Sequence, residues 1–274
     1  MRIIFILAAF FCISHAFAQK DANRTLYFPK VEAKPALVPA KKKVWVFVMA
    51  GQSNMAGRGQ VEAEDTVANE RILAINKAGE LVLAKEPLNL NEPSMVGLDC
   101  GMSFARTLLN SCPPDVSILL LHTAVGGSSI QKWIQDSVHR DVYLQSNFKA
   151  RVERAKVFGE IKGILWHQGE ADANSKGIPV YDARLDSLFG IFRKICGNKK
   201  LPILLGELGY FSKTSHEPFM EINRIMHEHA QHDKNSGVIV TKGLDHKGDQ
   251  LHFNTAGQRA IGRMFAELYA SKWL

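Results

Sequence analysis

Long apolar runs are scarce in this 274-residue chain, and their scarcity excludes most ways of crossing a membrane. The run at residues 3–13 follows Arg2 and leads into an Ala-Phe-Ala sequence at residues 16–18, a small-x-small cleavage pattern. Such a run is too short for a transmembrane helix and typical of a secretory signal peptide. We therefore expect residues 1–18 to be removed after Ala18. The mature protein is then secreted or periplasmic, with no membrane span.

Cysteine is also scarce. After cleavage three cysteines remain, Cys100, Cys112 and Cys196, an odd number that leaves at least one free thiol. Their spacing matches no zinc-binding pattern. A Cys100–Cys112 disulfide is conceivable in an oxidising compartment, and the sequence leaves it open.

Concentrated positive charge is missing as well, although the formal net charge is +7. The basic residues are scattered apart from Lys41-Lys42-Lys43, and no basic stripe is interleaved with aromatic residues. This distribution argues against nucleic acid as a partner. The sequence leaves the oligomeric state open.

The mature chain divides into a short leader and one domain. Residues 19–43 are polar and contain Pro29, Pro35 and Pro39, which favours an extended leader. Residues 44–274 are numerous enough for a single domain with a buried core.

Within this domain, short apolar runs alternate with helical patterns. The strand-like runs lie at residues 44–50, 117–122, 161–166, 201–206 and 237–241. The helical patterns lie at residues 102–110, 145–158, 180–196, 218–233 and 255–272. This alternation predicts βαβ units in a three-layer α/β/α sandwich with a mostly parallel sheet. Residues 72–84 predict a small hairpin inserted after the first strand.

Polar motifs follow three of the strand-like runs, where an open parallel sheet places its ligands. Gly51-Gln52-Ser53-Asn54-Met55 follows the first, so Ser53 is a candidate nucleophile, with a helix N-cap as the alternative. Residues 123–129 follow the second and contain the pair Gly126-Gly127, which lets a backbone N–H approach a ligand, or forms an ordinary loop.

The third motif is His167-Gln168-Gly169-Glu170. An uncharged Gln168 amide suits an oxyanion, whereas the alternative for this segment is a polar turn with a helix-capping Glu170.

A fourth motif precedes the last helix. Asp249 and His252 are three residues apart in a loop, so the carboxylate can face Nδ1 of the imidazole. That contact fixes the tautomer and leaves Nε2 to accept a proton from a serine. An isolated D-x-x-H pair is weak evidence for a catalytic site, but the evidence is stronger in a chain that also has a serine at the end of a strand.

Taken in order, GQSNMAG, AVGG, HQGE and the C-terminal D-x-x-H resemble the SGNH-hydrolase superfamily. More narrowly they resemble carbohydrate esterase family 6 and sialate O-acetylesterase domains, from about residue 44 to residue 268. The resemblance implies a flavodoxin-like α/β/α sandwich with about five mostly parallel strands. It also implies a carboxylic ester hydrolase that needs no cofactor or metal.

The resemblance assigns roles by position. Ser53 is the nucleophile, His252 is the general base and Asp249 is the third member, with Glu170 as a rival or assistant. The oxyanion hole comes from Ser53 N–H, a glycine N–H of Gly126 or Gly127, and the Gln168 side chain. The remaining polar residues of these motifs, Gln52, Asn54 and His167, are candidate substrate-binding residues.

The expected function is removal of O-acetyl groups from an acetylated oligo- or polysaccharide, as an acetylxylan esterase does, through an acetyl-enzyme on Ser53. The alternatives are a sialate O-acetylesterase, an SGNH esterase or lipase acting on other esters, and a non-catalytic carbohydrate-binding protein on the same fold. The cluster His227-Glu228-His229-Ala230-Gln231-His232 invites a metal interpretation. Gln231 stands where a zincin motif needs histidine, however, so an exposed helix is expected there.

Overall fold

The computed structural model describes residues 23–274, so the expected signal peptide lies outside the described residues. The described part of the leader lies against the domain rather than extending from it. Leu83 N–H donates to the Ala33 carbonyl at 2.7 Å, and the Asn76 side chain donates to Glu32 at 2.7 Å. The leader ends in one 3-10 turn, η1 (Lys41–Lys43). None of the helices between residues 23 and 274 combines the length and apolar character that a bilayer crossing requires.

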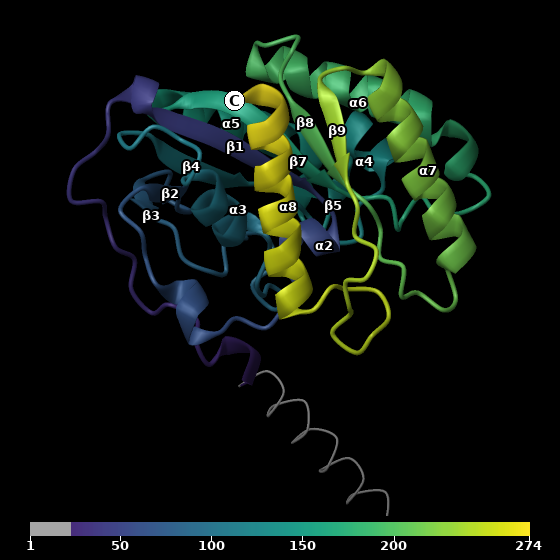
Figure 1. Ribbon diagram of the computed structural model, residues 1–274, viewed down its shortest axis with the longest axis horizontal. Helices are drawn as coiled ribbons and strands as arrows, with labels where there is room; N and C mark the ends of the chain where they lie inside the picture. The colour runs from purple at the N-terminus through teal and green to yellow at the C-terminus, as the bar shows by residue number, and fades with distance from the viewer. Residues whose placement is uncertain (1–22) are drawn as a thin grey trace, which may run out of the picture.

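A seven-stranded sheet forms the middle layer, in the order β3-β2-β4-β1-β7-β8-β9 (Figure 1). Its strands are β1 (Val44–Gly51), β2 (Ile72–Ile75), β3 (Leu81–Leu83), β4 (Ser117–His122), β7 (Glu160–His167), β8 (Ile203–Gly206) and β9 (Ser236–Ile239). All neighbouring pairs are parallel except β2 with β3. The five expected strands are present, and the predicted hairpin adds two more because β2 pairs with β4. A separate two-stranded ribbon consists of β5 (Val138–His139) and β6 (Val142–Tyr143).

Helices cover both faces of the sheet, which confirms the predicted three-layer fold (Figure 1). One face is covered by α3 (Gly101–Leu108) and α8 (Thr255–Trp273), and the other by α4 (Ile130–Ile134), α5 (Leu144–Phe158), α6 (Tyr181–Cys196) and α7 (His216–His232). The short elements are α2 (Ser53–Ala56), η2 (Ala63–Thr66) and η3 (Ile178–Val180).

The apolar sequence of β1 explains its central place. Val46 and Val48 pack into the core under α4–α7, whereas Phe47 and Met49 pack into the core under α3 and α8. Since successive side chains of a strand point to opposite faces, a run without polar residues suits a strand that is buried on both sides. The sheet therefore holds the end of β1 at the middle of the molecule, where Ser53 follows.

Candidate active site

Ser53 is held at the carboxyl end of β1 by the approach of two strand ends. Gly51 has φ 138°, and a Cβ there would lie 2.2 Å from the His167 carbonyl oxygen, so only glycine fits. The next residue, Gln52, donates its N–H to that same carbonyl at 3.0 Å. The chain then turns at once into α2, with Ser53 as its first residue and 8% exposed.

His252 reaches Ser53 from the loop before α8. The His252 Nε2 to Ser53 Oγ distance is 2.9 Å, and the His252 Nδ1 to Asp249 Oδ2 distance is 2.7 Å. Asp249 Oδ1 accepts the backbone N–H groups of Leu251 and His252 at 3.0 and 2.9 Å. Gln250 has φ 58°, the left-handed conformation that folds the carboxylate back over this turn. The structure therefore joins serine, imidazole and carboxylate in one line of hydrogen bonds.

Burial and hydrogen bonding determine the charge states of His252 and Asp249. Burial lowers the pKa of His252 from its ordinary 6.5, and the Asp249 carboxylate only partly offsets that effect. For Asp249, burial would raise the pKa, but the backbone N–H and side chain of His252 lower it to about 2. At neutral pH the pair is thus a neutral imidazole beside an ionised carboxylate, the protonation state that a general base requires.

The two glycines of the AVGG segment have different partners. Gly126 donates its N–H to Glu92 Oε2 at 2.8 Å, which engages this group away from any substrate. Gly127 has φ 74°, and within residues 23–274 its N–H donates to no other group. Ser53 N–H belongs to the first turn of α2, where no intrahelical acceptor exists. Of the two expected alternatives, the structure therefore leaves Gly127 N–H available to an oxyanion.

Gln168 does not occupy the oxyanion position that its motif suggested. Its side chain is fully buried, and its amide nitrogen donates to Asp172 Oδ2 at 2.6 Å, with Gln52 Oε1 and the Ser128 carbonyl at 3.2 and 3.3 Å. Tyr181 OH lies 2.8 Å from the Gln168 carbonyl oxygen and 3.0 Å from Gln168 Oε1, so its single proton can be donated to either oxygen of this residue. Because an amide has two N–H donors, none remains for a substrate oxygen.

Asn54 and His167, expected as substrate-binding residues, are structural instead. Asn54 is fully buried and donates to Glu170 Oε1 at 2.6 Å and to the Leu251 carbonyl at 3.2 Å. Its Oδ1 accepts Phe253 N–H at 3.1 Å, so Asn54 holds both neighbours of His252. His167 is also fully buried, and burial lowers its pKa to about 4. Neither side chain has surface left for a ligand.

Glu170 supports His252 indirectly rather than by contact. Its Oε1 holds Asn54, and its buried Oε2 has no hydrogen-bond partner among the described residues. Burial raises the pKa of Glu170 above its ordinary value. The carboxylate that contacts Nδ1 of His252 is that of Asp249, whereas Glu170 reaches the His252 loop only through Asn54.

Gln52 retains a free donor. Its Oε1 accepts from Gln168 Nε2 and from Ala171 N–H, both at 3.2 Å. In the described part of the chain its amide nitrogen has no hydrogen-bond partner, although the residue is only 4% exposed. This amide, one residue before Ser53, is the side-chain donor that the structure leaves unused.

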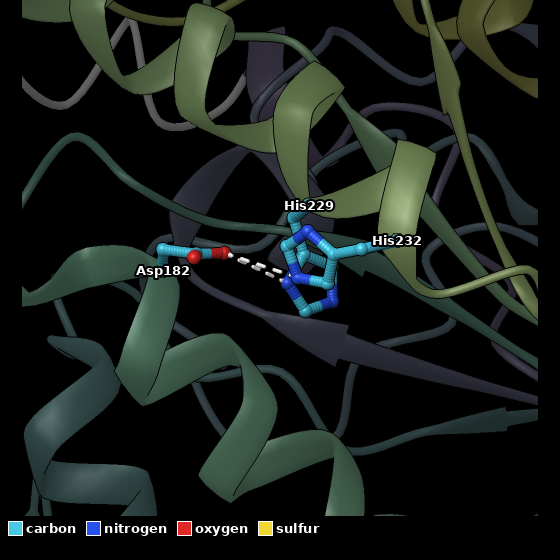
Figure 2. A group of neighbouring side chains, drawn as sticks. All are labelled: Asp182, His229 and His232. Atoms are coloured by element: carbon cyan, nitrogen blue, oxygen red, sulfur yellow. Dashed lines mark hydrogen bonds and ion pairs between the residues drawn. The ribbon is translucent and has the colours of Figure 1, made fainter.

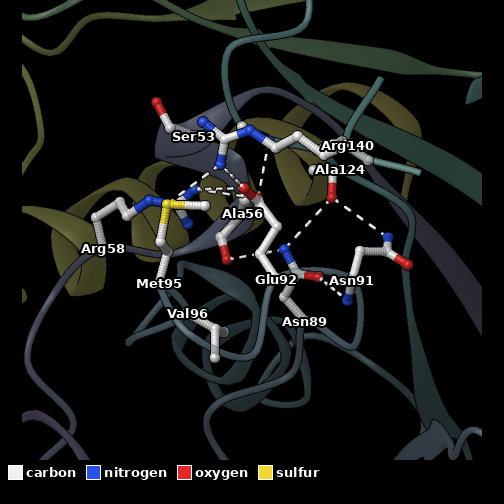
Figure 3. A network of polar contacts seen from close by, with 12 residues as sticks. Ser53, Ala56, Arg58, Asn89, Asn91, Glu92, Met95, Val96, Ala124 and Arg140 are labelled. Atoms are coloured by element: carbon white, nitrogen blue, oxygen red, sulfur yellow. Dashed lines mark hydrogen bonds and ion pairs between the residues drawn. The ribbon is translucent and has the colours of Figure 1, made fainter. Parts of the chain in front are cut away.

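Two arginines that no sequence motif identified lie beside the site (Figure 3). Glu92 accepts from Arg58 Nη2 at 3.0 Å and also pairs with Arg140. The Arg58 guanidinium contacts the position where a side chain on Gly126 would stand, and its charge lowers the pKa of His252. Arg58 directly follows GQSNMAG, whereas Glu92 and Arg140 come from loops without recognisable patterns. One carboxylate facing two guanidinium groups leaves a net positive charge.

Other sequence expectations are resolved elsewhere in the fold. The three cysteines between residues 23 and 274 are free thiols, so Cys100 and Cys112 are not joined. In the histidine cluster of α7, His229 is fully buried, which corrects the expectation of an exposed helix there. Its burial results from α6, which packs alongside α7 (Figure 1).

Comparison with known proteins supports an esterase. Residues 43–271 match the model of a family described as carbohydrate esterase, sialic acid-specific acetylesterase. A protein of Arabidopsis thaliana described as a probable carbohydrate esterase is 27% identical over 270 residues, which cover 88% of this chain and 96% of that protein.

Solved structures agree in fold. An X-ray structure of an Arabidopsis thaliana protein, 27% identical, matches with a TM-score of 0.72 over 84% of this chain and 99% of that one. NanS matches with a TM-score of 0.67 at 17% identity over 86% of this chain and 99% of its own. A carbohydrate acetylesterase from Xanthomonas citri matches at 0.61 and 18% identity, over 83% of this chain and 56% of that one.

Proposed function

This chain belongs to the carbohydrate esterase family described as sialic acid-specific acetylesterases, and from that membership we propose that it removes O-acetyl groups from a saccharide through an acetyl-enzyme on Ser53. The observation that carries the proposal is the line from Asp249 Oδ2 through His252 to Ser53 Oγ, with contacts of 2.7 and 2.9 Å. Nucleophile, base and orienting carboxylate are thus within hydrogen-bond reach of one another.

The reaction proceeds in two steps. Ser53 Oγ attacks the acetyl carbonyl carbon while its proton passes to His252 Nε2. The oxyanion that forms is stabilised by Ser53 N–H and Gly127 N–H, and the Gln52 amide supplies the side-chain donor in place of Gln168. The bond to the sugar oxygen then breaks, and that oxygen takes the proton from His252. A water molecule, deprotonated by His252, then attacks the acetyl-enzyme. The bond to Ser53 Oγ breaks, Oγ takes the proton back from His252, and acetate is released.

A fluorophosphonate probe tests the nucleophile directly. We expect one molecule of probe per chain, located on the peptide that contains Ser53 by mass spectrometry, with loss of acetate release in proportion to labelling. Labelling of another residue with full loss of activity would remove Ser53 from this role.

For the substrate we propose an acetylated sugar that carries a carboxylate, as sialic acids do, in preference to acetylxylan. The net positive charge of Arg58, Arg140 and Glu92 beside the site supports this choice, since an anionic sugar gains a charge-assisted hydrogen bond there and a neutral xylan does not. Arg140 lies between β5 and β6 with its side chain partly exposed, so a ligand can contact it.

Acetate release from O-acetylated sialic acid and from acetylated xylo-oligosaccharide distinguishes the two substrates. In Arg140→Gln the ratio of kcat/KM for the sialate over the xylo-oligosaccharide should fall about tenfold, the loss of one charge-assisted contact. Lys149→Gln, which removes the same charge from an exposed position on α5, is the matched control. Preference for the xylo-oligosaccharide with no change in the ratio would favour the acetylxylan esterase.

We also propose that residues 1–18 direct secretion and that the domain starts at Val44 after the leader. The apolar run and the Ala-Phe-Ala pattern before Gln19 support the cleavage. N-terminal sequencing of the exported protein should give Gln19 as its first residue, and recovery of the full chain inside the cell would contradict it.

A further inference from the structure

A second group of histidines and aspartates lies where α6 and α7 pack together, and Figure 2 shows Asp182, His229 and His232 of this group. Asp182 and Asp186 are four residues apart on α6, and His229 and His232 are three apart on α7. Since residues three and four apart share one face of a helix, each helix presents two potential ligands to the other. The sequence separates the two pairs by more than 40 residues, so only the packing brings them together.

The ligand atoms of this group are close to one another. His229 Nδ1 lies 3.0 Å from Asp182 Oδ1 and 3.7 Å from Asp186 Oδ1. His232 Nε2 lies 3.7 Å from Asp182 Oδ1 and 3.8 Å from Asp186 Oδ1. One atom each from Asp182, His229 and His232 falls within 4.8 Å of both others.

We propose that Asp182, His229 and His232 bind one divalent transition-metal ion, with Zn²⁺ as the best fit and Asp186 beside the site. Zinc binds imidazole nitrogen and carboxylate oxygen at about 2.0–2.2 Å in a tetrahedron, which places neighbouring ligand atoms about 3.3–3.5 Å apart. Asp182 Oδ1 lies 3.0 and 3.7 Å from the ligand nitrogens of His229 and His232, both within about 0.5 Å of that spacing. Nitrogen ligands distinguish this group from the all-oxygen sites that Ca²⁺ and Mg²⁺ prefer.

The surroundings of His229 are those of a metal-bound histidine. Its side chain is 1% exposed, and Nε2, the nitrogen that faces away from Asp182, has no hydrogen-bond partner in the described region. Asp233 Oδ2 lies 3.8 Å from that nitrogen and is itself held by Arg193 and Ser236 at 2.7 and 2.6 Å. A histidine that binds a metal commonly directs its other ring nitrogen to such a fixed carboxylate.

The negative charge of the two aspartates also favours binding of a cation. Within residues 23–274 the ion pairs of Asp182 and Asp186 involve only His229 and His232. A divalent ion between the two helices carries the two positive charges that match these two carboxylates. The site joins two surface helices and uses none of the residues proposed for ester hydrolysis, so its role is to stabilise the α6–α7 pair.

Metal titration of untagged, chelator-treated protein tests the proposal. One equivalent of ZnCl₂ should bind, as measured by calorimetry, and free Zn²⁺ at about 100 times Kd should raise Tm by about 5 °C. Equal concentrations of MgCl₂ or CaCl₂ should leave Tm unchanged. One equivalent of CoCl₂ should give the intense visible absorption of a tetrahedral site, and Zn²⁺ should displace it.

Two variants locate the ion. His232→Gln and Asp182→Asn change half-exposed side chains, so the fold should survive, and each should weaken Zn²⁺ binding about 100-fold or more. His216→Gln, at the other end of α7 and exposed, is the matched control and should bind as the wild type does. Absence of a zinc-specific rise in Tm, or wild-type affinity in either ligand variant, overturns the proposal.

Discussion

Two histidine–aspartate pairs in this molecule have nearly the same geometry but different surroundings. In the loop before α8, His252 Nδ1 contacts Asp249 at 2.7 Å, and on α7 His229 Nδ1 contacts Asp182 at 3.0 Å. The opposite nitrogen of His252 faces the hydroxyl of Ser53 at 2.9 Å, whereas that of His229 faces the carboxylate of Asp233 at 3.8 Å. The pair alone therefore does not define the chemistry. A hydroxyl on the far side suits proton transfer, and further carboxylates with a second imidazole suit a cation.

Ser53→Ala should have the largest effect on turnover, and it should leave the His229–Asp182 pair unaffected. Removing the hydroxyl leaves His252 with no proton to accept, and loss of a serine nucleophile typically reduces kcat by about 10⁶-fold. The measurement is acetate release from an acetylated sugar, with circular dichroism to verify the fold. Retention of even a tenth of wild-type turnover would show that Ser53 is not the nucleophile. Binding of Zn²⁺ at His229 should be unaffected, because Ser53 contributes nothing to that site.

Asp249→Asn should have the next largest effect, a fall in kcat of about 10³-fold with KM nearly unchanged. The amide can no longer stabilise the imidazolium that forms when His252 takes the serine proton. Steady-state kinetics on one acetylated substrate measure both constants.

Glu170→Gln is the comparison for that variant. Glutamine keeps an acceptor oxygen for Asn54, so the loop that carries His252 should stay in place and kcat should fall only about tenfold or less. A larger loss for Glu170→Gln than for Asp249→Asn would make the glutamate the true partner of His252. Comparable losses would indicate that both carboxylates support it.

Local motifs account for what the sequence could predict. The apolar run before Gly51 predicts a strand buried on both faces, so the position of Ser53 just after the carboxyl end of a central strand follows from the sequence. Asp249 and His252 share one short turn, so their contact depends on local backbone geometry, as their spacing suggested. The same reasoning predicted the alternation of strands and helices that gives the three-layer fold.

Roles that depend on distant partners could not be predicted. Gln168 has the uncharged amide that suits an oxyanion donor, but this amide contacts Asp172 and Tyr181 instead. Glu92 unites Arg58 with Arg140 across 82 residues of sequence, and no pattern in the intervening chain marks that contact. His229 belongs to a helix that the sequence predicted to be exposed, but α6 packs against that helix and buries the side chain. In each case the deciding neighbour comes from tertiary packing.

The pH dependence of kcat/KM should show a smaller, graded effect. Protonated His252 cannot accept a proton, so activity falls about tenfold per pH unit below its pKa. Burial lowers that pKa below 6.5, so the enzyme should keep most of its activity at pH 6.5 and lose it at more acidic pH. Asp249 favours the charged imidazole, and its replacement by asparagine should shift the acidic limb to still lower pH. An acidic limb above pH 6.5 would contradict this environment for His252.

Chelation should have the smallest effect on turnover, less than about twofold, while it lowers Tm. The proposed reaction uses a hydroxyl, an imidazole, an orienting carboxylate and N–H donors, which are complete without an ion. Tyr181, the residue before Asp182, links the α6–α7 site to the active site. Its hydroxyl lies 2.8 Å from the carbonyl oxygen of Gln168 and 3.0 Å from Gln168 Oε1. Since Gln168 is buried behind the site, stiffening α6 through a bound ion should change stability more than chemistry. The measurement pairs initial rates with Tm on the same sample, first with one equivalent of ZnCl₂ and then after EDTA and desalting. If EDTA abolished acetate release and ZnCl₂ restored it, the metal would take part in the reaction, and the two histidine–aspartate pairs would no longer be independent.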